Sequence, residues 1–459
     1  MPWTTRKKLL VGVPATLVGV ALLVFVAGRA FCYHSLERAT EAFRKRGFPT
    51  QIAEIVPTSV SESDNSAPLL AQATALLQAL EPDSTDAQAI DALIEQDRTK
   101  QNLPVAEAAL KFAHYDRQPI HELVLLAREA AQRPLNLPNR DYALGPALEM
   151  PELGTTRTLS QILATRVYLG LILENSVDEA WSDISVQFGL AELASQPPTL
   201  IDSLTGVACR RITFGSLQAT IDAGQFVRAH DSLLKAMLQS DLRWHDHMVN
   251  MLHGERFVFL DWFTTEFMAH DDWVNEIAAL AAGNDGRPRR RVPQLVGSLL
   301  RPLAAFDLSH AYRYHFEIVD AVASQPSHEV YPAIASAEQR VTSTRWPLTA
   351  ISAPMLGKIL KTHHAAWSEQ RVWTIALASA SLRASSGQWP QTITELCLPP
   401  ELLLDPCSGN PIHFVATAEE IVIYADGLDR KDDGGTPWQS LAEASVERGD
   451  IVVALKLSR

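Results

Sequence analysis

Four side chains that could ligate a metal or transfer a proton lie close together in the chain: His245, His247, His253 and Glu255. Histidine and glutamate in such a group are typical of metal-assisted hydrolysis and of acid–base catalysis. At about 100° per residue, His247 lies roughly 200° around a helix from His245, and Glu255 lies roughly 200° from His253. No two of them are four residues apart, so one helix cannot direct three of these ligands toward one ion. Surface or core roles are therefore predicted for them.

Other motifs with a known chemistry are missing from the sequence. It has no phosphate-binding GxxxxGK[ST] loop, no GxGxxG after a strand, no GxSxG and no HExxH. His363 and His364 would point about 100° apart on a helix and lack a third ligand. We identify no catalytic activity in the sequence. The enzymatic alternative is a hydrolase or lyase whose site is assembled from distant residues, with His245, His253 or Glu255 as candidates.

The elements that would have to position such residues are mainly helices. Apolar residues recur every three or four positions over 159–171, 177–191 and 200–221, and again from Phe226, with short breaks between these segments. Further helices are predicted over 248–282, 295–324, 328–342 and 353–386. Short turns between amphipathic helices make neighbours antiparallel. The predicted fold is mainly α, an irregular α-solenoid of helical hairpins.

The last quarter of the chain has a different pattern. Runs rich in β-branched and aromatic residues occur at 411–415, 421–424 and 451–455, and the first two are joined by a short acidic link. This pattern predicts a hairpin and a third strand. The expected C-terminal module is a small α+β unit with a three-stranded antiparallel sheet, preceded by a long helix.

This module resembles the globular end of type II secretion major pseudopilins. The matching features are a turn after the long helix, a hairpin with the pattern D-P-x-G-x-P, and an acidic glycine-rich loop after a tyrosine-containing strand. The residues that carry the resemblance are Gly387, Trp389, Pro390, Asp405, Pro406, Gly409, Pro411, Phe414, Tyr424, Asp429, Asp432, Asp433, Gly434 and Gly435. The whole arrangement also resembles a group of bacterial single-span membrane proteins, and that resemblance implies no activity.

The resemblance implies a calcium site, because the acidic loop of major pseudopilins holds this ion. Asp429, Asp432 and Asp433 would supply carboxylates, and Asp426 and Asp450 could join them. Calcium prefers six to eight oxygen ligands on a chain that bends sharply. A solvated acidic turn without metal is the alternative. The chain also departs from pseudopilins, because a long helical body separates its apolar N-terminal segment from the module, so assembly into a filament is not expected.

Cysteines give little information about the compartment. Cys397 and Cys407 lie on either side of the turn, where a disulfide would suit an oxidising compartment, and two separate thiols are the alternative. Cys209 lies in a helical stretch and is expected to pack in the core.

The clearest single feature is an uncharged apolar run from Leu9 to Gly28. A helix of this length, at about 1.5 Å per residue, spans the roughly 30 Å of a bilayer core. The run therefore predicts one transmembrane anchor. The alternative is a cleaved signal peptide, although signal-peptide apolar cores are usually shorter, about 7–15 residues.

The orientation of this anchor is not fixed by charge. Arg6, Lys7 and Lys8 precede the run, but basic residues also follow it, at Arg29, Arg38 and 44–46, so their count alone would place the body in the cytoplasm. The pseudopilin-like module favours the opposite orientation. The prediction is a single-pass protein of the bacterial inner membrane with its body on the extracytoplasmic side.

The chain has 459 residues and a formal charge of −13, which argues against nucleic acid as a partner. The basic cluster of Arg287 and Arg289–Arg291 either contacts lipid phosphates or an acidic partner, or is a solvated linker.

Four regions are predicted: an anchor (1–32), a short helix and linker (33–65), a helical body (66–350) and the C-terminal module (351–459). The predicted function is a membrane-anchored helical scaffold that binds another protein or a cell-envelope component. A second alternative is an accessory component of a secretion machine.

Overall fold

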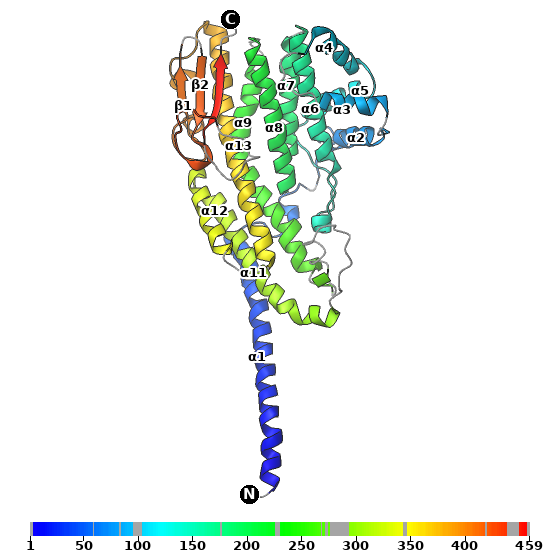
Figure 1. Ribbon diagram of the computed structural model, residues 1–459, viewed down its shortest axis with the longest axis vertical. Helices are drawn as coiled ribbons and strands as arrows, with labels where there is room; N and C mark the ends of the chain where they lie inside the picture. Colours follow the sequence, from blue (N-terminus) through cyan, green and yellow to red (C-terminus); the bar gives the residue numbers. More distant parts are fainter. Residues whose placement is uncertain are drawn as a thin grey trace.

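The computed structural model describes residues 3–57, 59–81, 84–94, 103–174, 177–224, 230–267, 269–270, 274–275, 293–342, 347–417, 420–437 and 449–456. The fold is mostly helical, with a small three-stranded sheet at the C-terminal end (Figure 1). Both of these predictions are confirmed. The body is elongated, and one long N-terminal helix projects from it.

The first helix, α1 (Trp3–Arg46), is a single helix of 44 residues. It ends at Gly47, whose positive φ of 78° is a conformation that glycine adopts without strain. Its C-terminal part packs into the body, where Leu36, Ala39 and Phe43 are buried. Its N-terminal part extends away from the body (Figure 1).

A group of shorter helices follows a linker that contains the 3₁₀ turn η1 (Ile52–Glu54). These helices are α2 (Ala67–Gln78), α3 (Thr85–Ile94), α4 (Val105–Phe112) and α5 (Ile120–Ala131), with the 3₁₀ turn η2 (Ala113–Asp116) between the last two. They share a hydrophobic core with the next long helix. A proline-rich loop with the 3₁₀ turn η3 (Tyr142–Ala147) then leads to that helix.

The long helices of the body lie side by side (Figure 1). They are α6 (Pro151–Ile172), α7 (Val177–Ala194), α8 (Leu200–Asp222) and α9 (His230–Glu255), and α6, α7 and α8 each contact the other two. Thr199 caps α8 by accepting the N–H of Asp202 on its side chain. After α9 the chain is π-helical in η4 (Arg256–Asp261) and η5 (Phe263–Phe267), so the long α-helix expected over 248–282 changes type at Arg256.

Three helices form the second half of the body: α11 (Gln294–Ser324), α12 (Ser327–Thr342) and α13 (Pro347–Ser386). One hydrophobic cluster joins α1, α9, α11, α12 and the first half of α13. A second cluster joins α7, α8, α9 and the second half of α13 to the sheet. The helix α13 therefore belongs to both cores.

The C-terminal module begins with the 3₁₀ turns η6 (Ile393–Leu396) and η7 (Pro400–Leu403). The strands β1 (His413–Ala416), β2 (Glu420–Ala425) and β3 (Ile451–Lys456) are antiparallel in the order β1-β2-β3, and Tyr424 pairs with His413 and with Val452. The 3₁₀ turn η8 (Gly427–Asp429) follows β2.

A buried carboxylate, that of Asp405, holds the turn of this module together. It accepts the backbone N–H groups of Cys407, Ser408 and Gly427 and the hydroxyl of Ser368 on α13. The D-P-C-S-G segment therefore has a structural role, because one side chain ties the turn to Gly427, just after β2, and to the long helix.

Candidate functional site

A cavity of about 250 Å³ lies where the linker after η1, the proline-rich loop, the turn before α8 and helix α9 meet. Its wall is mostly apolar, and prolines contribute from three of these segments. The apolar lining residues are Ile55, Val56, Pro57, Val60, Pro134, Leu135, Leu137, Pro138, Pro197 and Pro198. Mostly apolar concave sites with a few placed polar groups are typical ligand sites.

Two polar atoms of residues that line this cavity have no hydrogen-bond partner of ordinary geometry. They are the hydroxyl of Tyr142 and the Oδ1 of Asn136, and both atoms are buried. The Asn136 amide nitrogen donates to the Leu193 carbonyl, and the Asn136 backbone N–H donates to Gln196 Oε1 at 2.7 Å. An unpaired buried polar atom is costly, and both of these atoms are shielded from solvent in the wall of the cavity.

Helix α9 contributes Arg243, His247 and Asn250 to the wall of the cavity, and Arg243 brings a positive charge. Glu192 accepts Arg243 Nη2 at 2.9 Å and Ser240 Oγ at 2.7 Å, and it also pairs with the buried Arg210. Burial opposes ionisation of Glu192, but Arg210 and Ser240 hold its pKa below the usual value. Two arginines thus share one carboxylate, and Arg243 lines the cavity. Burial lowers the pKa of His247, which also lines the cavity, so its ring is neutral at pH 7.

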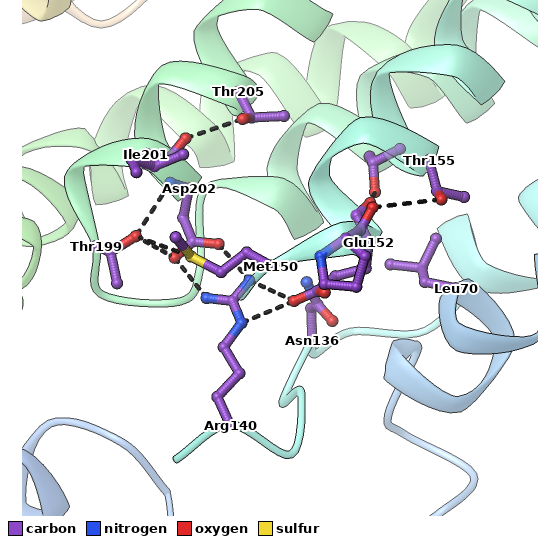
Figure 2. Close-up of polar contacts among 12 residues, drawn as sticks. Leu70, Asn136, Arg140, Met150, Glu152, Thr155, Thr199, Ile201, Asp202 and Thr205 are labelled. Atoms are coloured by element: carbon purple, nitrogen blue, oxygen red, sulfur yellow. Dashed lines mark hydrogen bonds and ion pairs between the residues drawn. The ribbon is translucent and has the colours of Figure 1, made fainter. Parts of the chain in front are cut away.

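A buried ion-pair cluster lies next to the cavity and fixes the proline-rich loop (Figure 2). Arg140 Nη1 and Nη2 donate to Asp202 Oδ2 and Oδ1, both at 2.7 Å, and its Nε donates to Glu152 Oε1 at 2.7 Å. Thr199 Oγ1 donates to Asp202 Oδ2 at 2.5 Å. The Arg140 side chain is only 3% exposed and that of Asp202 is 0% exposed. One arginine therefore joins the loop to the first turns of α6 and α8.

The electrostatics of this cluster are set by burial and by charge pairing. Burial raises the pKa of Asp202, although the hydrogen bonds from Arg140 and Thr199 oppose the shift. Burial alone would lower the pKa of Arg140, but Asp202 and then Glu152 raise it, so the guanidinium stays charged. Burial also raises the pKa of Tyr142. The three charged groups of the cluster pair with one another, and Arg140 opposes the pKa shift of the Tyr142 hydroxyl, which has no hydrogen-bond partner of ordinary geometry.

The acidic loop after β2 does not present its carboxylates as one ligand set. Asp429 Oδ1 accepts the N–H of Lys431, Asp432 Oδ1 accepts that of Gly434 at 2.8 Å, and Asp433 Oδ2 accepts that of Gly449 at 3.0 Å. Among the residues that the structure describes, no three His, Cys, Asp or Glu side chains are placed to hold a metal ion. Calcium binding by Asp429, Asp432 and Asp433 stays a prediction.

The two further acids of this region are engaged in hydrogen bonds. Asp450 accepts the N–H groups of Asp433 and Gly435, and burial raises its pKa. Asp426 accepts Asn410 Nδ2 at 2.7 Å and pairs with His413 Nε2 at 3.0 Å. These contacts fold the loop onto the sheet.

The histidines of α9 do not gather at one point with Glu255. His253 is buried against the ring of Phe48, at 5.0 Å between centroids, and neither of its ring nitrogens has a partner. Burial and then Arg256 lower the pKa of His253 to about 4, and burial raises that of Glu255 to about 7. The cavity is lined by His247 and by none of His245, His253 and Glu255.

The remaining candidates are also placed in structural settings. His363 and His364 are buried in α13, and burial lowers the pKa of both, that of His363 to about 3. Cys397 is exposed, Cys407 is buried, and both are free thiols, as are the buried Cys32 and Cys209. The basic cluster Arg287 and Arg289–Arg291 lies outside the described residues.

Sequence reasoning missed the cavity and the Arg140 cluster. Residues 133–150 carry several prolines and have the sequence pattern of a connecting loop. An arginine between prolines in such a loop, followed by acidic residues at the starts of two helices, was the available signal. Comparisons with protein-family models, curated proteins and solved structures matched nothing, so the site has to be interpreted from its own geometry.

Proposed function

We propose that this protein is a membrane-anchored helical binding protein whose body lies on the extracytoplasmic side of a bacterial inner membrane. The observation that carries this proposal is the placement of α1. One part of this helix is packed in the core through Leu36, Ala39 and Phe43, and the other part projects away from the body (Figure 1). A rigid helix with this arrangement is suited to hold a body at a fixed position relative to a membrane.

The apolar character of the projecting part supports a bilayer as its environment. The residues of α1 that leave the body include Leu23 (71% exposed), Val24 (63%) and Val26 (62%). They continue the uncharged run that begins at Leu9. Among the described residues, no helix meets the length and hydropathy expected of a membrane span. The proposed anchor therefore rests on the sequence of 9–28 together with the geometry of α1.

The C-terminal module supports the proposed orientation. Its turn after the long helix, its hairpin and its acidic loop are the features that resemble the globular end of major pseudopilins, which lies outside the cytoplasm. We also interpret the antiparallel helices α6, α7 and α8 as stacked helical hairpins, which gives the body the character of a scaffold.

The cavity beside α9 is the proposed binding site. Its proline-rich wall suits an apolar group of a partner protein or an envelope component. Arg243, which lines the cavity, would favour an acidic group. Site-specific crosslinking can test this role. The photo-crosslinking residue benzoylphenylalanine in place of Val60 is expected to form an adduct with the partner. The substitution Leu137→Trp, which fills the cavity, should abolish this adduct. The same probe in place of the exposed Leu110 should form none.

The anchor is tested by membrane fractionation. The substitutions Val18→Lys and Leu22→Lys place two charges in the apolar run, at about 2.5–3.5 kcal/mol each at the centre of a membrane helix. The variant is expected to leave the carbonate-resistant membrane fraction, while the control Leu110→Lys stays in it. Retention of the double variant in that fraction would contradict the anchor.

The orientation is tested separately. Alkaline phosphatase fused after Arg459 should be active and β-galactosidase at the same position inactive. The reverse pattern would place the body in the cytoplasm.

A further inference from the structure

Three leucines near the start of α11 are exposed on one face of the helix. Leu299, Leu300 and Leu303 are 52%, 37% and 52% exposed. At about 100° per residue, Leu300 and Leu303 lie roughly 100° and 40° around the helix from Leu299. Single exposed leucines are ordinary on a protein surface. Three on one face form an apolar patch of the kind that marks an interaction site.

The position of this patch follows from the contacts between α11 and α1. Phe31 packs on Phe306 at 5.6 Å, Ser35 Oγ lies 3.0 Å from Ser309 Oγ, and Arg46 Nε lies 2.5 Å from Asp320 Oδ1. The partners differ in residue number by about 274 in each case, so the two helices run in the same direction.

This register places the leucines at a defined level along α1. Because both helices rise by about 1.5 Å per residue, Leu303 lies level with Arg29, and Leu299 and Leu300, which precede Pro302, lie close to the same level because the helix turns across α1 there. Gly28 is the last residue of the uncharged apolar run and Arg29 is the first charge after it. The leucine patch is thus level with the end of the proposed membrane span.

The path of α11 also changes at this level. Pro302 lies inside the helix, where proline removes a hydrogen bond and bends the axis. In Figure 1 the first turns of α11 form the lower edge of the body and run across the direction of α1, near the point where α1 leaves the body. A helix in this orientation would lie flat on a bilayer that α1 crosses.

We propose that the first turns of α11 are an interfacial membrane helix, with Leu299, Leu300 and Leu303 inserted at the boundary between headgroups and acyl chains. This inference rests on the proposed function, because it requires that α1 enters a bilayer. Interfacial helices insert an apolar face about 5–10 Å deep in this way. Lipid is the occupant because the patch continues the apolar surface of α1 at the same level.

The proposed contact would fix the orientation of the body. A single helix leaves a body free to tilt and rotate on the membrane, whereas a helix in the bilayer together with a second helix on its surface restricts both motions. The cavity beside α9 would then be presented at a constant height and in a constant direction.

The experiment uses the full-length protein in vesicles of phosphatidylglycerol and phosphatidylethanolamine. Cys397 is the only thiol that is exposed among the four cysteines, so Cys397→Ser gives the background for single-cysteine labelling. An environment-sensitive nitrobenzoxadiazole label is placed on Leu299→Cys and Leu303→Cys. Val24→Cys reports on α1. Leu110→Cys, 73% exposed on α4 at the far end of the body, is the matched control (Figure 1).

Quenching by nitroxide-labelled lipids separates the outcomes. The proposal expects blue-shifted emission and strong quenching at 24, 299 and 303, and neither at 110. Quenching at 24 with solvent-like emission at 299 and 303 would overturn the interfacial helix and leave the anchor intact. Solvent-like emission at 24 would overturn both. Hydrogen exchange of the unsubstituted protein is a second measurement, in which vesicles should protect 297–303 more than detergent-free buffer does.

Discussion

The substitution Arg140→Met tests whether the buried ion-pair cluster holds the wall of the cavity. The Arg140 side chain, 3% exposed, is the counter-ion of Asp202, which is 0% exposed. Methionine has a similar length and remains apolar, so it fills most of the space without creating a large cavity. The main loss is therefore electrostatic. Asp202 would remain buried with the Thr199 hydroxyl and without a positive charge.

Removing one partner of a buried ion pair costs about 3–5 kcal/mol of stability. Since 1.4 kcal/mol corresponds to about a factor of ten, the ratio of folded to unfolded protein should fall by roughly two to three and a half orders of magnitude. The matched control is Arg340→Met, because Arg340 pairs with Glu317 at the surface, where their side chains are 61% and 49% exposed. A surface pair contributes about 0–1 kcal/mol.

Urea denaturation of the full chain in nanodiscs measures the loss of unfolding free energy in each variant. Hydrogen exchange over 134–150 shows whether the loss in Arg140→Met is centred on the loop. The deficit should shrink as the pH falls, because burial raises the pKa of Asp202 above its ordinary 3.8 and a protonated Asp202 needs no counter-ion. The double variant Arg140→Met/Asp202→Asn should recover part of the loss. A deficit no larger than that of Arg340→Met, or one that grows as the pH falls, would refute the reasoning.

Three other outcomes are expected. Gly254→Ala should destabilise the protein by about 1–3 kcal/mol, because a Cβ there would lie 1.5 Å from the Pro198 carbonyl oxygen. The control Gly215→Ala should be neutral or stabilising, because a Cβ at this position meets nothing within 4 Å. Thermal unfolding compares the two variants. The pKa of Glu255 in the folded protein, about 7, lies above its ordinary 4.5. This residue should therefore make the stability of the protein fall as the pH rises from 4.5 to about 7. The stability of the Glu255→Gln variant, measured over the same pH range, should lack this part of the fall. If the acidic loop binds calcium, calorimetric titration should give heat with the unsubstituted protein and none with Asp432→Ala/Asp433→Ala; absence of heat in the unsubstituted protein would remove the calcium prediction.

The regular elements could be predicted because their signals are local. Apolar residues at helical spacing marked α6, α7 and α8, and alternation with β-branched residues marked all three strands. The change from α- to π-helix at Arg256 could not be predicted in this way. It occurs where Arg256 is buried, donates to the Pro49 carbonyl and lies over the ring of Phe43, and these partners are about 200 residues away in the chain.

The candidate site was missed for a related reason. Histidines and acids that are close in sequence, such as His245, His253 and Glu255, suggested a site, but they do not converge in the structure. The cavity and its neighbouring ion pairs combine a linker at 55–60, a loop at 134–142, the turn at Pro197–Pro198 and helix α9. Each segment on its own resembles a connection, and only their packing creates a site.

The buried charges of the body show why these segments hold a fixed arrangement. Arg371 on α13 donates to Asp241 on α9 at 2.8 Å and also to the carbonyl oxygens of Glu401 and Leu404 in the C-terminal module, at 2.7 and 2.8 Å. Arg140 similarly joins a loop to two helices, and Glu192 joins α7 to α8 and α9. A buried charge tolerates little displacement, because the attraction to its partner offsets the free energy lost on leaving water. Separation from the partner would remove this attraction. The body should therefore move as a unit, so that the geometry fixed where α1 and α11 meet is transmitted to the cavity.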